Sequence, residues 1–165
     1  MPKKYAQLLF RLVKNHKPEN ILELGTSLGI TTSYLAFASP NSKIFTIEGS
    51  EEIYNKANEN FENLKLRNIH SICGSFNDNL NSVLESIDKL DFVLFDGDHK
   101  YDSTVRYFEM CLKKYNQKSI FVFDDIKWSK EMENAWDYIK KKEEVSLTID
   151  VFKMGIVFFD KQLSK

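Results

Sequence analysis

The chain has 165 residues, of which 42% are hydrophobic and 28% are charged, and its formal net charge at pH 7 is -1. This composition is typical of one folded globular domain and excludes a disordered tail or a fibrous repeat. The near-neutral charge offers no electrostatic basis for binding nucleic acid, so no nucleic-acid partner is expected.

Short apolar runs alternate with amphipathic segments along the chain, which is the pattern of β-α units in a mainly parallel sheet. A first helix is expected before Lys17-Pro18, which stops it. Five buried strands follow, and each ends in Gly, Ser, Glu or Asp, so polar residues gather at their carboxyl ends. These strands are predicted at residues 21–24, 44–47, 69–73, 92–95 and 120–123.

Helices are predicted between these strands. One opens at Gly29, and the next starts at Ser50, an N-cap residue that two glutamates follow in the first turn. Apolar side chains at helical spacing predict two more helices, around residues 105–115 and 136–139.

The end of the chain changes character. Two strand-like runs, at residues 147–152 and 156–159, are separated only by Lys153-Met154-Gly155. A gap this short allows a hairpin but no helical crossover, so the sheet is expected to end in an antiparallel pair. The sequence thus predicts a single α/β domain over residues 1–165, with an N-terminal helix within 1–19 and a core over 20–160.

The first strand runs into a glycine turn, Glu23-Leu24-Gly25-Thr26-Ser27-Leu28-Gly29, and then into a helix. Such a turn lets backbone N–H groups approach a ligand closely. The dinucleotide pattern G-x-G-x-x-G is absent. The acid Glu23 disfavours a pyrophosphate at this turn and suits a cationic group, although a generic strand-to-helix turn with a polar strand end is the alternative.

Two further strand ends carry candidate binding residues. Glu48-Gly49 ends the second strand, about 20 residues after the glycine turn, where an acid can accept both hydroxyls of a ribose. A carboxylate at a helix start is the alternative for Glu48. Gly74, Ser75 and Phe76 follow the third strand: Gly74 permits close approach, Ser75 is a candidate to meet an adenine, and Phe76 either covers its face or is simple core.

The chain resembles the class I S-adenosylmethionine-dependent methyltransferases in the order of four features along its sequence. These are Glu-x-Gly-x-x-x-Gly, Glu48, Gly74-Ser75-Phe76 and Asp96. The resemblance covers about residues 21–159. It implies a Rossmann-like, seven-stranded, mainly parallel sheet with helices on both faces. It also implies that the last strand is antiparallel and lies between the fifth and sixth.

The resemblance implies S-adenosylmethionine as cofactor. Gly25, Thr26, Ser27 and Gly29 would then hold its methionine end, beside Glu23. Glu48 and Gly49 would hold the ribose, and Gly74, Ser75 and Phe76 the adenine, with Asp96 as a further cofactor contact. The commonest family motif has glycine where this chain has Ser27, a departure also found in catechol and caffeoyl-CoA type O-methyltransferases.

Acidic residues end the fourth and fifth strands, as Asp96-Gly97-Asp98-His99 and Asp124-Asp125. If these strands are neighbours, the carboxylates converge, and like charges that close resist joint ionisation unless a proton or cation intervenes. Oxygen ligands of this kind suit Mg²⁺. The arrangement resembles the metal-dependent O-methyltransferases, including the macrocin type. Catechol-type enzymes, however, have an Asp-Asn pair where this chain has Asp124-Asp125. That resemblance implies Asp96, Asp124 and Asp125 as ligands of Mg²⁺ or another divalent cation.

His99 is the candidate general base, because an imidazole with an ordinary pKa near 6.5 accepts a proton at neutral pH. A capping or hydrogen-bonding role is its alternative, and Asp98 competes for the catalytic role. Trp128 either flanks an acceptor pocket or packs between the fifth strand and the next helix.

The favoured function is O-methylation of a small-molecule acceptor. A nicotinamide-dependent oxidoreductase is a weaker alternative, because the dinucleotide pattern is absent and the sheet ends in a hairpin. A catalytically idle S-adenosylmethionine-binding module is the other alternative, since a single helix before the first strand gives the acceptor little cover. A longer chain or a second copy in a homo-oligomer would supply that cover, and the aspartate cluster favours activity.

Cys73 and Cys111 fall in a strand pattern and on a helix, and both are interpreted as small core residues rather than disulfide partners. No apolar run reaches the roughly 20 residues that span a bilayer, and the N-terminus lacks the apolar segment of a signal peptide. The expected location is therefore the cytoplasm, without a membrane partner.

Overall fold

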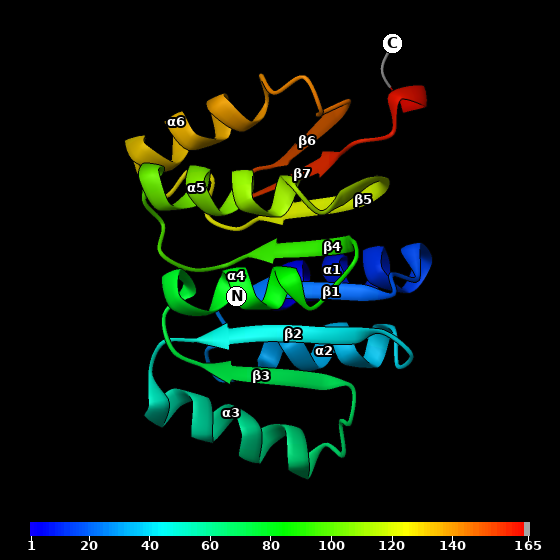
Figure 1. Ribbon diagram of the computed structural model, residues 1–165, viewed down its shortest axis with the longest axis vertical. Helices are drawn as coiled ribbons and strands as arrows, with labels where there is room; N and C mark the ends of the chain where they lie inside the picture. The colour runs from blue at the N-terminus through cyan, green and yellow to red at the C-terminus, as the bar shows by residue number, and fades with distance from the viewer. Residues whose placement is uncertain (164–165) are drawn as a thin grey trace. The chain divides into compact units, whose positions relative to one another are not determined.

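Figure 1 shows the computed structural model of the chain, which describes residues 1–163. It consists of two compact units, residues 1–87 and residues 88–165. Residues 164 and 165, which the predicted single domain includes, lie outside the described residues.

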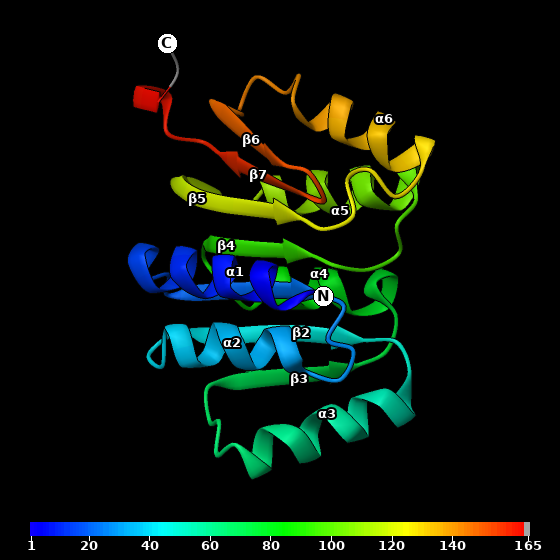
Figure 2. The ribbon, with the colours of Figure 1, turned by 180° about the vertical axis from the view of Figure 1, so that it is seen from behind.

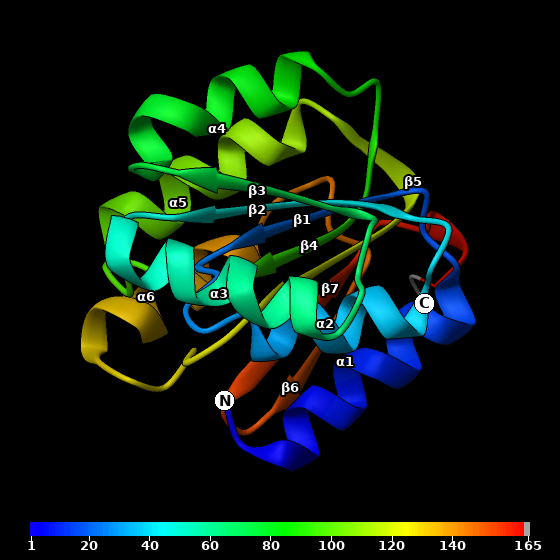
Figure 3. The ribbon, with the colours of Figure 1, turned by 90° about the horizontal axis from the view of Figure 1, so that it is seen from below.

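The first unit has three parallel strands in the order β3-β2-β1, so their carboxyl ends meet at one edge. Helices cover both faces of these strands: α4 lies on one side, and α1 and α2 lie side by side on the other (Figures 2 and 3). The elements are α1 (Lys3–His16), β1 (Asn20–Leu24), α2 (Ile30–Ala38), β2 (Lys43–Glu48), α3 (Glu51–Asn63), β3 (Ile69–Cys73) and α4 (Phe76–Glu85).

The second unit has four strands in the order β4-β5-β7-β6. β4 and β5 are parallel, whereas β7 runs antiparallel to both of its neighbours, β5 and β6. Helices α5 and α6 pack against each other on one face of these strands (Figures 1 and 2). The elements are β4 (Leu90–Phe95), α5 (Tyr101–Leu112), β5 (Tyr115–Phe123), α6 (Lys130–Ile139), β6 (Leu147–Val151), β7 (Met154–Phe158) and the 3₁₀-helix η1 (Lys161–Leu163).

Apolar strand residues form the core of each unit. Ile21 and Leu22 on β1 are fully buried because helices cover both faces, which explains why consecutive strand residues are apolar. In the second unit Phe95 and Phe123 stack with ring centroids 4.3 Å apart, and Phe108 on α5 meets Phe123 edge-on at 5.8 Å. These aromatic contacts fix the helix over the ends of β4 and β5.

The predicted strands and the closing hairpin are confirmed, including the insertion of β7 between β5 and β6. β5 begins at Tyr115, earlier than predicted, and the hairpin turn is shorter, because β7 already begins at Met154. The N-cap prediction for Ser50 is also confirmed, since its side chain accepts a hydrogen bond from the Ile53 N–H.

The two cysteines differ. Cys111 is buried on α5, as predicted, and burial raises the pKa of its thiol. The prediction for Cys73 is wrong, because this residue is exposed at the end of β3, which pairs with β2 on one side only within its unit. Both thiols are free.

Among residues 1–163, no helix combines the length and the apolar character that crossing a membrane requires.

Gly155 on β7 lies against Trp136 of α6, and a Cβ atom at position 155 would come within 2.6 Å of the indole ring. Because Trp136 is buried, Gly155→Ala forces the ring or the strand to move, and we expect a loss of about 1–3 kcal/mol in the free energy of unfolding by urea. Gly49→Ala is the matched control, since a Cβ there meets nothing within 4 Å. Equal stability of the two variants would contradict this packing constraint.

Candidate functional site

The glycine turn after β1 has a backbone conformation that suits ligand approach. Gly25, Ser27 and Gly29 have φ of 108°, 49° and 74°, so the turn bends through the left-handed region at three places. Ser27 takes this conformation although it carries a side chain, which costs about 1 kcal/mol or more. A Cβ at Gly29 would come within 2.4 Å of the Phe61 ring on α3, so both packing and conformation require glycine there.

The Glu48 carboxylate, at the end of β2, holds the turn in place. Its Oε2 accepts the Ser27 N–H at 2.8 Å, and its Oε1 accepts the Ser50 N–H at 3.0 Å. A carboxylate has about four acceptor positions, so two remain for donors from a ligand. Glu48 thus acts at the start of α3, whose N-cap is Ser50, while its ribose role stays a prediction.

Glu23 is fully buried at the end of β1. Its Oε2 accepts hydrogen bonds from the hydroxyls of Thr32 at 2.5 Å and Thr46 at 2.7 Å. Its Oε1 is buried and has no hydrogen-bond partner among the described residues. Burial raises the pKa of Glu23 to about 7, against the lowering effect of the two threonine hydroxyls. A buried acceptor without a partner fits a donor from a bound cofactor.

Thr32 and Thr46 are site residues that the sequence analysis missed. Thr46 pairs in register with Glu23 across β1 and β2, and its hydroxyl lies 2.6 Å from that of Thr26 in the turn. The available signal was a polar residue in the otherwise apolar second strand. It pointed to no partner, because the register between the strands is not readable from the sequence.

The segment after β3 is built around the start of α4. Ser75 is the N-cap: its hydroxyl accepts the Asp78 N–H at 3.2 Å and donates to the Asp78 carboxylate at 2.6 Å. The Gly74 N–H donates to the Glu48 carbonyl at 2.8 Å, which brings this segment beside the end of β2. Phe76 is half-buried as the first residue of α4. The adenine roles of Ser75 and Phe76 stay predictions.

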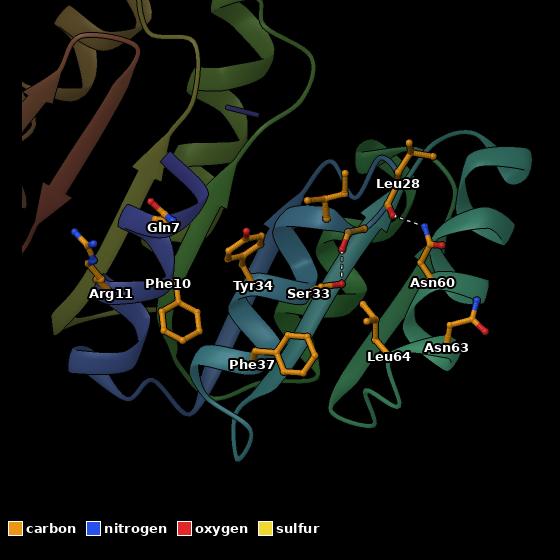
Figure 4. A pocket seen from close by; sticks show the side chains of 12 residues that line it. Gln7, Phe10, Arg11, Leu28, Ser33, Tyr34, Phe37, Asn60, Asn63 and Leu64 are labelled. Carbon is orange, nitrogen blue, oxygen red and sulfur yellow. Dashed lines mark hydrogen bonds between the residues drawn. The ribbon is translucent and has the colours of Figure 1, made fainter. Parts of the chain in front are cut away.

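An apolar groove of about 880 Å³ lies in the same unit, along α1, α2 and α3 (Figure 4). Two of its polar groups bond to the protein itself: Ser33 donates to the Gly29 carbonyl at 2.7 Å, and Asn60 donates to the Leu28 carbonyl at 3.0 Å. Leu28 and Gly29 of the glycine turn line this groove, whereas the carboxylates of Glu23 and Glu48 do not. The lining residues are Gln7, Phe10, Arg11, Leu28, Gly29, Ile30, Ser33, Tyr34, Phe37, Asn60, Asn63 and Leu64.

In the second unit the predicted neighbours β4 and β5 are paired, with Phe95 opposite Phe123. The Asp124 N–H donates to the Phe95 carbonyl at 2.9 Å, so Asp96 and Asp124 follow adjacent strand ends. The Asp124 side chain is only 2% exposed. Its Oδ1 is buried and has no hydrogen-bond partner among the described residues.

Lys153, from the turn between β6 and β7, binds both Asp124 and Asp125. Its Nζ lies 3.3 Å from Asp124 Oδ2 and 3.0 Å from Asp125 Oδ1. Burial alone would lower the pKa of Lys153, but the hydrogen bonds and charges of the two carboxylates outweigh it and raise the pKa. Sequence analysis missed this lysine, because only the antiparallel register of β7 on β5 brings the turn to the end of β5.

The predicted metal ligands do not present a metal site in this arrangement. Across residues 1–163, no three Asp, Glu, His or Cys side chains gather closely enough to hold an ion. The ammonium of Lys153 lies between the carboxylates that were expected to ligate the cation.

His99 lies near this group, with its Nε2 3.8 Å from Asp125 Oδ2. That distance is too long for a hydrogen bond and allows an ion pair once the imidazole is protonated. Asp98 is exposed, and its carbonyl accepts the Ser103 hydroxyl at 3.0 Å at the start of α5. Both remain candidates for the general base.

Trp128 follows Asp125 on the loop before α6 and is 72% exposed, so the packing interpretation of this residue is wrong. The loop reaches α6 through Ser129, whose hydroxyl accepts the Met132 N–H as N-cap. The two aspartate side chains therefore do not cap this helix.

Glu23 makes the stability depend on pH. The folded protein holds its proton up to about pH 7, whereas the unfolded chain releases it near 4.5. Between these pH values the folded state binds more protons than the unfolded state. The contribution of Glu23 to the free energy of unfolding therefore falls by about 3 kcal/mol as pH rises through that window. Glu23→Gln keeps an acceptor for the threonines and removes this fall.

We therefore expect the stability of Glu23→Gln relative to wild type to rise by about 3 kcal/mol between about pH 5 and about pH 8, measured by urea unfolding. Glu51→Gln is the control, since Glu51 is exposed on α3. A stability difference that stays constant with pH would show that Glu23 titrates normally.

Comparisons with known proteins agree with this architecture. The chain superimposes on an O-methyltransferase from Bacillus cereus in complex with SAH, with a TM-score of 0.82 and 22% identity, over 96% of this chain and 82% of that one. It also superimposes on the O-methyltransferase TomG from Streptomyces achromogenes, in complex with SAM, with a TM-score of 0.84 and 18% identity, over 96% and 81%. The SAH-bound Podospora anserina methyltransferase PaMTH1 gives a TM-score of 0.80 and 14% identity, over 96% and 79%.

These likenesses confirm the predicted Rossmann-like methyltransferase fold. A family model described as a methyltransferase domain matches residues 22–126, which is more than half of the chain. The match includes the glycine turn, Glu48, the segment after β3 and both aspartate segments. The chain therefore belongs to the methyltransferase domain family.

Proposed function

We propose that this protein transfers a methyl group from S-adenosylmethionine to an oxygen atom of a small molecule. The observation that carries the proposal is the pair of carboxylates, Glu23 and Glu48, at the ends of β1 and β2 on either side of a left-handed glycine turn. Family membership supports methyl transfer, and the SAH and SAM in the structurally similar O-methyltransferases support the cofactor.

The residues of the first unit fit this cofactor. Glu23 offers a buried acceptor without a partner to the cationic methionine end, beside the turn of Gly25, Thr26, Ser27 and Gly29. Glu48 has two acceptor positions left for the ribose hydroxyls, with Gly49 beside it, and Ser75 and Phe76 are proposed for the adenine. When bound, the cofactor supplies a sulfonium methyl group, which is open to direct attack by an oxygen nucleophile.

The acceptor oxygen must lose a proton as it gains the methyl group. His99 is proposed as the base, with Asp98 as the competing group, since an imidazole is suited to take a proton near neutral pH. Asp125, near His99, would stabilise the imidazolium that forms. The remaining rate enhancement comes from positioning the acceptor.

A divalent cation on Asp96, Asp124 and Asp125 is not part of this mechanism, because the ammonium of Lys153 lies between the last two carboxylates.

The rest of the proposal follows the sequence expectations. One catalytic domain spans residues 1–165, a second copy of the chain completes the cover of the acceptor, and the protein resides in the cytoplasm, which its two free thiols support.

Glu48→Ala is expected to weaken S-adenosylhomocysteine binding by about 1–3 kcal/mol in calorimetry, because it removes an acceptor for two hydroxyl donors and loosens the turn at Ser27. Glu51→Ala, an exposed acid three residues further on, should bind as wild type does. NAD should show no comparable binding to any of the three proteins. Unchanged affinity in a folded Glu48→Ala variant would remove Glu48 from the ribose role.

His99→Ala is expected to leave S-adenosylhomocysteine binding intact and to lower turnover by roughly 10²–10⁴-fold, because it removes the base. Turnover is followed as S-adenosylhomocysteine formation over a panel of catechols and other phenols. Near-normal turnover would transfer the role to Asp98. Cofactor binding without turnover on any acceptor would favour the idle binding module.

A further inference from the structure

Two adjacent carboxylates at the end of β5 create a charge problem. Asp124 is almost fully buried and Asp125 is largely covered, with side-chain exposures of 2% and 18%. Moving a carboxylate out of water costs several kcal/mol, and a second negative charge beside it adds to that cost. The pair therefore needs a positive charge in contact with it.

Lys153 supplies this charge from within the chain. Its Nζ is 3.0 Å from Asp125 Oδ1 and 3.3 Å from Asp124 Oδ2, so one ammonium binds both carboxylates. The backbone holds it there: the Ile126 N–H donates to the Lys153 carbonyl at 3.0 Å, and Phe123 pairs with Gly155 across β5 and β7. The sheet register thus delivers the ammonium to the aspartates.

Lys127, another lysine of this region, forms an exposed ion pair and so contrasts with Lys153. Lys127 forms an ion pair with Asp150 at 3.2 Å, but both side chains are more than 40% exposed. A surface pair of this kind contributes about 0–1 kcal/mol and leaves no buried charge behind when it is broken. Lys153, in contrast, contacts both carboxylates of the largely buried pair, which makes Lys127 a matched control.

We propose that Lys153 is the resident cation of this site and takes the place that a divalent ion would occupy between Asp124 and Asp125. An ion bound to these oxygens at about 2.0–2.6 Å would lie close to an ammonium held by the same atoms, and the two positive charges would repel. The site is therefore closed to Mg²⁺ and Mn²⁺ while Lys153 is present, and the ammonium offsets one of the two aspartate charges without a metal.

Mn²⁺ binding, followed by electron paramagnetic resonance and calorimetry, tests this without any acceptor. Wild type and Lys127→Met should bind Mn²⁺ only weakly and alike. Lys153→Met keeps most of the length of the side chain and removes its charge, which frees the carboxylate oxygens, so its affinity for Mn²⁺ should rise by roughly tenfold or more. Asp125→Asn in the same background should abolish the gain.

Two results would overturn the proposal. One is tight Mn²⁺ binding by wild type that Asp125→Asn removes. The other is a folded Lys153→Met that binds no more Mn²⁺ than wild type. If Lys153→Met does not fold, the Mn²⁺ titrations of Lys153→Arg and wild type test the proposal instead. Both proteins should exclude Mn²⁺, and tight Mn²⁺ binding by either would contradict the proposal that Lys153 is the resident cation.

The consequence for turnover rests on the proposed function. Wild type should keep full activity in chelator, whereas Lys153→Met should lose activity and recover part of it with Mn²⁺. Loss of wild-type activity in chelator, restored by Mn²⁺, would overturn the inference. Absence of turnover in every protein would count against the proposed methyl transfer alone, since the Mn²⁺ titrations stand independently.

Discussion

Burial of carboxylates at the carboxyl ends of parallel strands is the constraint on which both units depend. Parallel strands covered by helices leave little water at their ends, so an acid there must lose its charge or find a partner. Glu23 is met by two threonine hydroxyls, and burial raises its pKa to about 7. Asp124 and Asp125 are met by the ammonium of Lys153. Hydroxyl hydrogen bonds and a raised pKa thus meet the cost of burial in one unit, and an ion pair with a lysine meets it in the other.

These two solutions suit different chemistry. Glu23 keeps one buried oxygen without a partner, beside a turn whose N–H groups and neighbouring Glu48 are already fixed by hydrogen bonds. A site prepared in this way loses little conformational freedom when a ligand binds. The aspartate pair instead has one of its two charges balanced in advance by Lys153, and His99 lies 3.8 Å from Asp125. A proton taken up by His99 would therefore be stabilised by a carboxylate already in place.

Most of the fold was predictable because it follows from local patterns. Unbroken apolar runs such as residues 120–123 of β5 indicate strands covered on both faces, and a three-residue gap at Lys153-Met154-Gly155 permits only a hairpin. Individual environments were harder to predict. Cys73 was expected in the core and is exposed, and Trp128, for which packing was one of two interpretations, is 72% exposed. In both cases the residue type indicated burial, while its place at a strand end or in a loop decided the outcome.

The sequence by itself determined the β-α order, the glycine turn, the acids at the strand ends and the closing hairpin, because each is encoded within a few consecutive residues. Only the tertiary structure decided which side chains meet those acids. Thr46 meets Glu23 through the register of β1 and β2, and Lys153 meets Asp124 through the register of β7 on β5. Strand register is set by packing over the whole sheet, and a shift of one residue turns every side chain to the opposite face. For that reason the contact of Lys153 with both Asp124 and Asp125 could not be predicted from the sequence.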